Sequence, residues 1–373
     1  MTRKPYESYL EDIAQLITIR DEDRPIYTKD FDIIRDHVLN GMKKVDSVFR
    51  KMYQGTSLFG SYANNVRIKY PNEFDVIFIL GIPHSSNIVV NRDAYSPGYV
   101  NLDLEEVMEH LQDANGYAEV YDRFNELIDE DDCLLRKSFQ IWLKKVVRSC
   151  LKTYGNEIRG HQGDLYTLKY SKRGLAHTIY AKCTARSISI DLIPGISFGK
   201  AEWMKVSKRH RKMFGNTKWY AVPKPPVRLF HTKCCAFMIC NPKFERKLLL
   251  GRQNLKVVFR LLKSLRDKYG MKRLKSYFIT TAFLWEVEKQ KKSFWNNPLH
   301  ILLEHMLESL ADSFAEGCLP FYWDRKNNLL DNLDNEEIDD YAEKLKRAYE
   351  TLRQYKFEPN LTYKRCRTHF KLP

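Results

Sequence analysis

Residues 59–80, FGSYANNVRIKYPNEFDVIFIL, constrain the fold more than any other stretch of the chain. The run from Phe74 to Leu80 is apolar except for Asp75 and rich in β-branched and aromatic side chains, which predicts a buried strand. Glu73 and Asp75 stand two residues apart on this strand, so their side chains share one face, with Cα atoms about 6.5–7 Å apart. Two such carboxylates repel each other and are costly to bury unpaired. The pair predicts a site for two Mg²⁺ or Mn²⁺ ions, because hard cations prefer clustered oxygen ligands.

Two other segments supply the remaining parts of such a site. Residues 187–194, SISIDLIP, form a short β-branched alternation with Asp191 at its centre, and we expect Asp191 to be the third carboxylate. Gly60 and Ser61 offer a backbone amide and a hydroxyl to a phosphate, since glycine has no Cβ to block the approach. A helix N-cap is the plain alternative for Ser61, and it is compatible with phosphate binding. The alternative for the three acids is a set of salt-bridged strand residues, which their apolar context disfavours.

The order of these elements, G-S, then an E-x-D strand, then a lone Asp on a later strand, resembles that of nucleotidyltransferases with a polymerase-β-like core. Four longer segments resemble cyclic GMP-AMP synthase (cGAS) and the animal cGAS-like receptors: GSYANNVRIKYPNEFDVIFIL, ISIDLIP, KWYAVPKP from Lys218 and KSYFITTAFLWE from Lys275. Weaker similarity continues through LPFYWDRKNNLLDNL, near Leu319. The resemblance implies an α+β fold, with a bilobal nucleotidyltransferase core, a mixed sheet and a helical C-terminal lobe.

The same resemblance implies roles for individual residues. Glu73, Asp75 and Asp191 would be the catalytic and metal-binding residues, and Gly60 and Ser61 would bind nucleotide phosphates. Ser276 would touch a phosphate and Tyr277 would stack on a nucleobase. Lys256 and Lys263, on the preceding helical segment, are alternative triphosphate ligands, and a surface role for either stays open. Phe237 and Met238 stand where cGAS carries a Trp-Arg pair, so the nucleobases used and the linkage formed stay open.

The apolar spacing predicts how the rest of the chain is organised. We expect a helix over residues 6–19, a second over 31–49 that leads into the G-S turn, a loop over 84–99 and an amphipathic helix over 139–151. Residues 164–172 and 176–185 predict hairpin strands. Long helices are expected at 253–268, 277–289, 298–314 and 336–355. We place the boundary between the two domains near residue 205, giving a core at 1–204 and a helical lobe at 205–373.

The distribution of charge indicates a polyanionic partner. The net charge is +15, and residues 205–275 hold 21 Lys and Arg against only Glu245 and Asp267. Residues 101–132 show the reverse, with 12 Asp and Glu against Arg123 alone. A solvated basic face is the plain alternative, but a dense basic block is relieved by counterion release on a nucleic acid. The expected contacts form two clusters: Lys205, Lys208, Arg209, Arg211 and Lys212, and Arg136, Lys137, Lys144, Lys145 and Arg148.

The cysteine pattern favours free thiols over a zinc site or disulfides. His231, Cys234, Cys235 and Cys240 are rich in potential zinc ligands, but adjacent cysteines in an apolar run are more often buried thiols. Only residues 251–253 separate two helical patterns where the vertebrate enzyme carries its zinc thumb, so we expect no structural zinc. The eight cysteines show no disulfide framework, which fits a reducing compartment. No apolar run predicts a secretory signal or a membrane span, and we expect a cytoplasmic protein.

Taken with these features, the resemblance implies a nucleic-acid-activated cyclic dinucleotide synthase of innate immunity. It would join ATP and GTP into a cGAMP-type product by two-metal nucleotidyl transfer with release of pyrophosphate. The activator would be a duplex, with RNA favoured over DNA because a zinc thumb aids DNA binding in the vertebrate enzyme, and a dimer could form on it. Two alternatives stay open: a non-catalytic scaffold of the same fold, and a linear, oligoadenylate-type nucleotidyltransferase.

Overall fold

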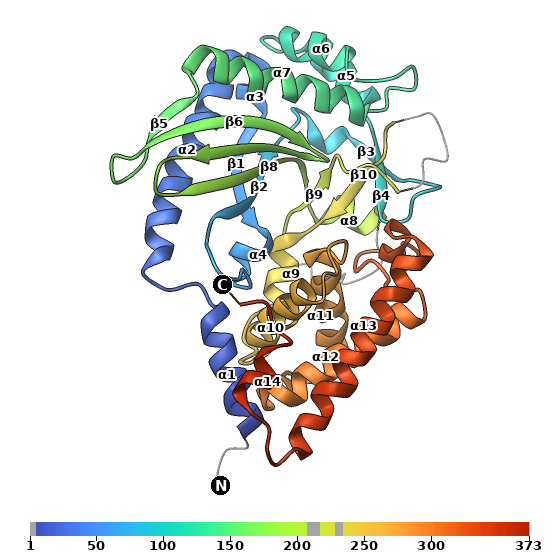
Figure 1. Ribbon diagram of the computed structural model, residues 1–373. Coiled ribbons are helices and arrows are strands. Elements are labelled where there is room, and N and C mark those ends of the chain that lie inside the picture. The colour runs from blue at the N-terminus through green and yellow to red at the C-terminus, as the bar shows by residue number, and fades with distance from the viewer. Residues whose placement is uncertain (1–4, 207–216, 228–233, 373) are drawn as a thin grey trace. The chain divides into compact units, whose positions relative to one another are not determined.

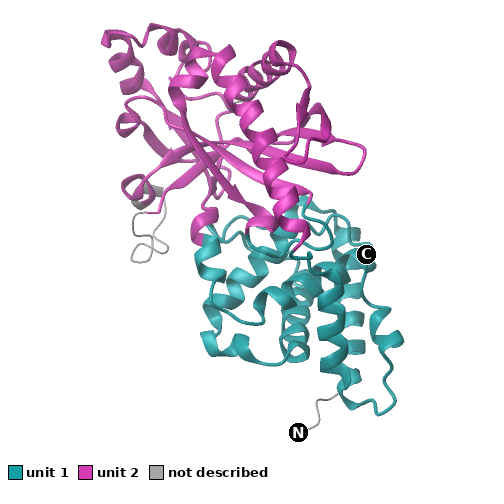
Figure 2. Cartoon of the chain, turned by 90° about the vertical axis from the view of Figure 1, so that its left-hand side faces the viewer, with its two compact units in different colours: residues 1–21, 64–71, 245–373 teal, residues 22–63, 72–244 magenta. Residues whose placement is uncertain are grey.

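The structure is a computed structural model that describes residues 5–206, 217–227 and 234–372. The chain divides into two compact units (Figure 2). The sheet unit comprises residues 22–63 and 72–244, and the helical unit comprises residues 1–21, 64–71 and 245–373. The predicted α+β class is confirmed, with a mixed sheet and a helical C-terminal region.

The described part of the sheet unit contains a ten-stranded mixed sheet (Figure 1). Strands β3 to β10 follow the order β3-β4-β10-β9-β8-β7-β6-β5, while β2 pairs with β8 and β1 pairs with β2. The β2–β8 pair is parallel, and the other pairs are antiparallel. The strands are β1 (Tyr53–Phe59), β2 (Glu73–Leu80), β3 (Val89–Arg92), β4 (Tyr99–Asp103), β5 (Glu157–Arg159), β6 (Leu165–Arg173), β7 (Ala176–Lys182), β8 (Ser187–Phe198), β9 (Trp219–Val222) and β10 (Phe237–Cys240).

The helices of this unit bury the apolar side of the sheet. Helix α2 contacts both α7 and β8, and Phe31 of α2 stacks on Phe74 of β2 with ring centroids 4.2 Å apart. On the other face of the sheet, Ile77 and Ile193 continue into a small buried cluster with Tyr220. The helices are α2 (Asp23–Val45), α3 (Ser47–Met52), α4 (Gly60–Ala63), η1 (Ser85–Asn87), α5 (Glu105–Asp113), α6 (Ala118–Asn125), α7 (Arg136–Tyr154) and α8 (Lys200–Val206).

The helical unit is built around α1, which packs against α10, α12 and α14, while α12 packs along α13. No helix among the described residues is both long and apolar enough to span a bilayer. Its elements are α1 (Pro5–Ile17), α9 (Pro242–Leu249, which begins at the end of the sheet unit), α10 (Leu255–Lys268), α11 (Ser276–Lys289), η2 (Lys292–Asn296), α12 (Leu299–Ala315), η3 (Leu329–Asn332), α13 (Asn335–Gln354), η4 (Tyr355–Phe357) and α14 (Tyr363–Arg367).

The structure differs from the expectations in three places. Residues 53–59 form strand β1 along β2, so the helical run that starts with α2 does not lead directly into Gly60. The expected loop at 84–99 contains β3, which pairs with β4. The sheet unit continues through residue 244 rather than ending near 205, because β9 and β10 add to the sheet, and the first 21 residues belong to the helical unit.

Candidate active site

The register of two parallel strands brings the predicted carboxylates together. Asp75 of β2 is the direct register partner of Asp191 of β8, and Glu73 pairs with Ser189. Neighbouring strands lie about 4.8 Å apart and in-register residues share a face, so all three carboxylates stand on one side of the sheet. All three are partly exposed. The alternating residues of the opposite face, Phe74, Val76, Ile190 and Leu192, are buried.

Asp191 has a defined hydrogen-bond partner and an unfavourable charge environment. The hydroxyl of Thr178, its register partner on β7, donates to Asp191 Oδ1 at 2.6 Å. Burial raises the pKa of Asp191, and the nearby charge of Glu73 raises it further, while the Thr178 hydrogen bond and the charge of Arg173 oppose the shift. A carboxylate that is harder to ionise beside a second acid is stabilised by a bound cation.

Gly60 lies directly against the Asp75 carboxylate. Its predecessor Phe59 pairs with Asp75 across β1 and β2, and Gly60 then turns the chain with a positive φ of 71°. A Cβ placed on Gly60 would lie 1.9 Å from Asp75 Oδ2. Only glycine therefore fits beside the carboxylate in this conformation.

The donor set fits two hard divalent cations. It consists of carboxylate oxygens on one face of β2 and β8, and Gly60 leaves room beside Asp75 where any larger side chain would clash. Within the described residues, no three His, Cys, Asp or Glu side chains already converge on one point. Bound ions would therefore draw the side chains of Glu73, Asp75 and Asp191 together.

Ser61 follows on the first turn of α4 and is partly exposed. The next residue fixes this turn, because Tyr62 packs on Phe74 with ring centroids 4.5 Å apart. The Tyr62 hydroxyl also shares a hydrogen bond of 2.6 Å with Thr28 of α2. The G-S turn is thus anchored to the strand that carries the carboxylates.

Two protein-family models match this chain. The Mab-21 protein nucleotidyltransferase domain matches residues 62–250, which include all three carboxylates, and the Mab-21 protein HhH/H2TH-like domain matches residues 254–347. The chain belongs to the Mab-21 nucleotidyltransferase family. The resemblance inferred from the sequence is confirmed.

Several curated proteins are similar to this Mab-21 family member over most of its length. Cyclic GMP-AMP synthase-like receptor 1 of Drosophila erecta is 35% identical over 86% of this chain and 72% of that protein. The protein of the same name in Drosophila melanogaster is 33% identical over 91% of this chain and 90% of its own length. The cyclic GMP-AMP synthase-like receptor of Lucilia cuprina is 31% identical over 93% and 92%.

The helical unit carries the other residues that the sequence singles out. Lys263 is only 3% exposed, and its ammonium donates to the backbone oxygen of Val66 at 3.2 Å. Lys256 is partly exposed, and burial lowers its pKa, with a further contribution from the charges of Arg260 and Arg246. The two lysines predicted as alternatives therefore have different surroundings.

Ser276 and Tyr277 begin helix α11, and both have polar partners within the helical unit. Arg266 donates to the Ser276 hydroxyl at 3.1 Å. The Tyr277 hydroxyl donates to Glu245 Oε1 at 3.0 Å, and the Trp323 indole donates to the same oxygen at 2.8 Å. Burial raises the pKa of Glu245 to about 7, although the two donors lower it. In the sequence, Glu245 is distinguished only as one of two acids in a basic block, and no local pattern predicts its burial beside Tyr277 and Trp323.

The predicted basic clusters are only partly described. Lys208, Arg209, Arg211 and Lys212 lie outside the described residues, as does the side chain of Lys205 of α8. Along α7, Lys145 and Arg148 are exposed and Lys144 is partly exposed, whereas Arg136 is buried at the start of the helix.

One basic residue near α7 was missed. Lys172 of β6 has its pKa lowered to about 8, first by burial and then by the charge of Lys144. Arg148 also lies close enough to lower the pKa of Tyr170. The basic face of α7 therefore extends onto the β6–β7 hairpin, a pairing that no local sequence pattern reveals.

The cysteines around β10 do not share one site. Four residues of mainly extended chain lie between Cys235 and Cys240, which puts their Cα atoms about 16 Å apart, whereas sulfur ligands of one zinc ion lie roughly 4 Å apart. Cys235 instead lies beside Cys133. His231 lies outside the described residues, and the absence of zinc stays a prediction.

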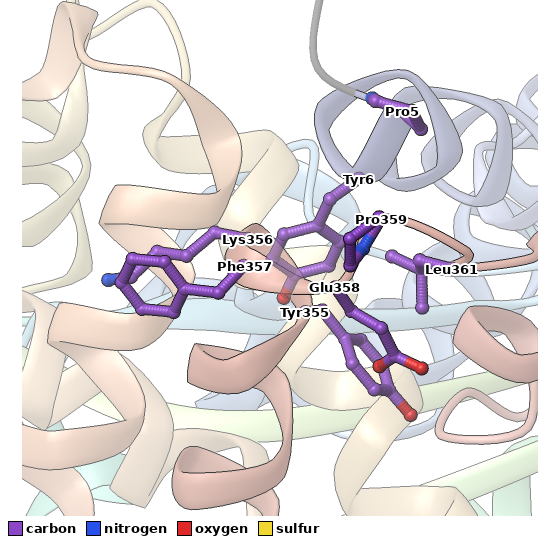
Figure 3. Close-up of a pocket in the computed structure, with 8 residues that line it drawn as sticks. All are labelled: Pro5, Tyr6, Tyr355, Lys356, Phe357, Glu358, Pro359 and Leu361. Atoms are coloured by element: carbon purple, nitrogen blue, oxygen red, sulfur yellow. The ribbon is translucent and has the colours of Figure 1, made fainter.

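A cavity of about 200 Å³ lies within the helical unit (Figure 3). Aromatic and proline side chains dominate it, and none of the predicted site residues lines it. Its lining residues are Pro5, Tyr6, Tyr355, Lys356, Phe357, Glu358, Pro359 and Leu361.

Proposed function

We propose that this protein is a nucleic-acid-activated cyclic dinucleotide synthase that joins ATP and GTP into a cGAMP-type product. The observation that carries the proposal is the side-by-side placement of Glu73, Asp75 and Asp191 on β2 and β8. The family supplies the reaction class, nucleotidyl transfer. The relatives, which are named cyclic GMP-AMP synthase-like receptors, support the product class.

Each carboxylate has a distinct task in this proposal. Glu73 and Asp75 would hold two Mg²⁺ or Mn²⁺ ions, and Asp191 would complete the second position. When bound, the ions lower the pKa of the attacking hydroxyl and neutralise the departing pyrophosphate. Asp191 would orient the incoming ribose hydroxyl and accept its proton, a role that suits a carboxylate whose pKa is raised. Ser61 and the amide that follows Gly60 would hold the outgoing phosphates.

Of the two lysines, we assign Lys256 to the triphosphate. The Lys263 ammonium is already bound to the Val66 carbonyl in the interior of the helical unit. Lys256 lies among cations that lower its pKa, and a bound polyanion would relieve their mutual repulsion. Ser276 and Tyr277 keep the roles that the family resemblance implies, phosphate contact and base stacking.

The activator is proposed to be double-stranded RNA. The extended basic face of Lys144, Arg148 and Lys172 supports a polyanion partner, because a lysine with a lowered pKa regains its full charge when phosphates approach. Such contacts read the shape of a duplex rather than its sequence. The second cluster, from Lys205 to Lys212, is proposed to act with it.

One experiment tests both activator and chemistry. Purified protein is incubated with four NTPs, labelled one at a time, Mg²⁺ or Mn²⁺, and either duplex RNA or duplex DNA, and the products are resolved. We expect a phosphatase-resistant cyclic dinucleotide containing AMP and GMP, formed only with duplex RNA. Linear oligomers would favour the oligoadenylate-type alternative, and no product under any condition would favour the scaffold.

The activating surface is tested separately. Charge reversal at Lys144 and Arg148, or at Lys208, Arg209 and Arg211, should remove duplex stimulation while sparing weak basal synthesis with Mn²⁺. Charge reversal at the exposed Lys346 and Lys364 of the helical unit is the control, which should leave stimulation unchanged. A parallel fall of basal and stimulated rates would place the mutated cluster in the active site or in folding.

A further inference from the structure

Two cysteine thiols from distant parts of the sequence meet in the sheet unit. Cys133 lies in the loop that leads into α7, and Cys235 lies two residues before β10. Roughly a hundred residues separate them in the sequence, yet their side chains interact and both cysteines contact Asp129. The pair has no role in the proposed nucleotidyl transfer.

A single carboxylate holds both cysteines in place. Asp129 Oδ1 accepts from the backbone N–H of Cys133 at 3.0 Å, and Asp129 Oδ2 accepts from the Cys235 thiol at 3.4 Å. The backbone N–H of Asp129 also donates to Cys133 O at 3.0 Å. The neighbouring segments are tied together as well, since the Arg136 N–H donates to Cys234 O at 2.8 Å. The two cysteines are therefore held close to each other by contacts on both segments.

The two thiols differ in exposure and in chemistry. Cys133 is partly exposed, whereas Cys235 is only 4% exposed. The neighbouring Cys235 side chain lowers the pKa of Cys133, against burial and the charge of Asp129, while the contact with Cys133, burial and Asp129 all raise the pKa of Cys235. Thiolates, not thiols, react with oxidants, so Cys133 reacts first. Cys235 is the thiol that can then attack the oxidised Cys133 sulfur.

We propose that Cys133 and Cys235 form a reversible disulfide when the protein meets a peroxide. The Cys133 thiolate attacks one oxygen of hydrogen peroxide, the O–O bond breaks, and Cys133 becomes a sulfenic acid as hydroxide leaves and takes up a proton to form water. The Cys235 sulfur then attacks the Cys133 sulfur, displaces the hydroxyl group and gives up its own proton, releasing a second water. Two thiols lose two electrons in total, and one peroxide gains them.

The disulfide would link the segment entering β10 to the loop entering α7. In the reduced protein the contacts between these segments include the Asp129 hydrogen bonds, the Arg136–Cys234 hydrogen bond and the packing of Phe139 on Phe237. A covalent link between them would restrict separation of α7 from β10 and raise the melting temperature. Oxidation would thereby act on the helix that carries Lys144 and Arg148.

The test uses the full chain, reduced, freed of reductant and titrated with hydrogen peroxide. Digestion without reduction, followed by mass spectrometry, should give one linked peptide pair containing Cys133 and Cys235, which dithiothreitol separates. In Cys235→Ser the sulfenic acid on Cys133 should persist and react with dimedone, and in Cys133→Ser the Cys235 thiol should stay unmodified. Cys318→Ser is the matched control, because Cys318 is exposed, and it should leave the linked pair unchanged.

Three outcomes would overturn the proposal. Conversion of Cys133 to sulfinic acid with Cys235 still free would show that the second thiol does not resolve the first. A linked pair that involves another cysteine, such as buried Cys150 or Cys366, would place the oxidised site elsewhere. Protection of both thiols until a chelator is added would show that they hold a thiophilic metal instead.

Discussion

The Thr178 hydroxyl donates a hydrogen bond of 2.6 Å to Asp191 Oδ1, between register partners on β7 and β8. Thr178 is fully buried, and its branched Cβ restricts χ1, so its hydroxyl is held in one direction. The bond occupies Oδ1 of Asp191, whose register partner on the other side is Asp75. Thr178 thus orients the third carboxylate of the proposed site.

Thr178→Val should lower nucleotidyl transfer by about 10- to 100-fold, because a hydrogen bond to a charged group contributes about 1.5–3 kcal/mol. Valine has nearly the same shape, so the fold should persist. The Mn²⁺ concentration needed for half-maximal rate should rise, since Asp191 loses its fixed orientation. Steady-state rates across a Mn²⁺ titration measure both effects.

Thr178→Ser is the matched control, because it keeps the hydroxyl and loses only a methyl group. It should recover most of the rate and the metal dependence of the wild type. Equal losses in the valine and serine variants would show that packing, not the hydrogen bond, explains the effect.

Glu73→Gln combined with Asp75→Asn should reduce product formation by about a thousandfold or more, because metal-ion catalysis contributes several kcal/mol. The fold should be kept, since removal of two neighbouring like charges relieves repulsion, and the melting temperature in the presence of a chelator should rise. Thermal unfolding gives a readout that is independent of activity. Mn²⁺ should raise the melting temperature of the wild type but not that of the variant. A variant with more than a few per cent of the wild-type rate would contradict the two-metal assignment.

The central part of this fold is predictable from local sequence because its signals are local. The apolar alternation around Asp75 and Asp191 predicts two buried strands, and both are present as β2 and β8. The helices α7, α10, α11, α12 and α13 also follow their apolar spacing closely. The pattern does not define the register of β2 against β8, which makes Asp75 and Asp191 direct partners.

The features that were missed depend on contacts between distant segments. The helix predicted over residues 31–49 was expected to lead into the G-S turn, yet residues 53–59 pair with β2 as β1, because ladder formation outweighs weak local preference. No local motif marks Thr178 or Lys172. Strand pairing places Thr178 beside Asp191, and the β6–β7 hairpin brings Lys172 near Lys144. Cys235 looked like part of a local ligand motif, but its neighbour is Cys133, which no spacing rule connects to it.

Gly60→Ala should abolish most activity and lower the melting temperature. The added methyl group would meet the Asp75 carboxylate, and alanine would be strained at φ 71°, at a cost of about 1 kcal/mol for the backbone alone. Gly163→Ala separates these effects, because Gly163 has φ 87° but open space around its Cβ position. It should lower the melting temperature only by the backbone contribution, less than Gly60→Ala, and keep full activity. Comparable rates in the two variants would remove the argument for close contact with Asp75.

Glu245 makes the stability of the helical unit depend on pH. Its carboxyl is buried with a pKa of about 7, against an ordinary value of 4.5. The folded state therefore binds the proton more tightly than the unfolded state. This contribution to stability is fully present below pH 4.5, and it is lost as the pH rises to 7, in total about 3 kcal/mol.

Glu245→Gln should remove this pH dependence, because glutamine has the same shape and its carbonyl oxygen can accept from Tyr277 and Trp323. Urea unfolding at pH 5 and pH 8 measures the effect as a difference between variant and wild type. The variant should match the wild type at pH 5, where Glu245 is largely protonated, and should exceed it at pH 8, where the wild type buries a charge. Glu350→Gln, at an exposed position of α13, is the control and should shift both measurements equally. A variant that is less stable than the wild type at pH 8 would show that ionised Glu245 is stabilised by its two donors, and that its pKa lies below the ordinary value instead of above it.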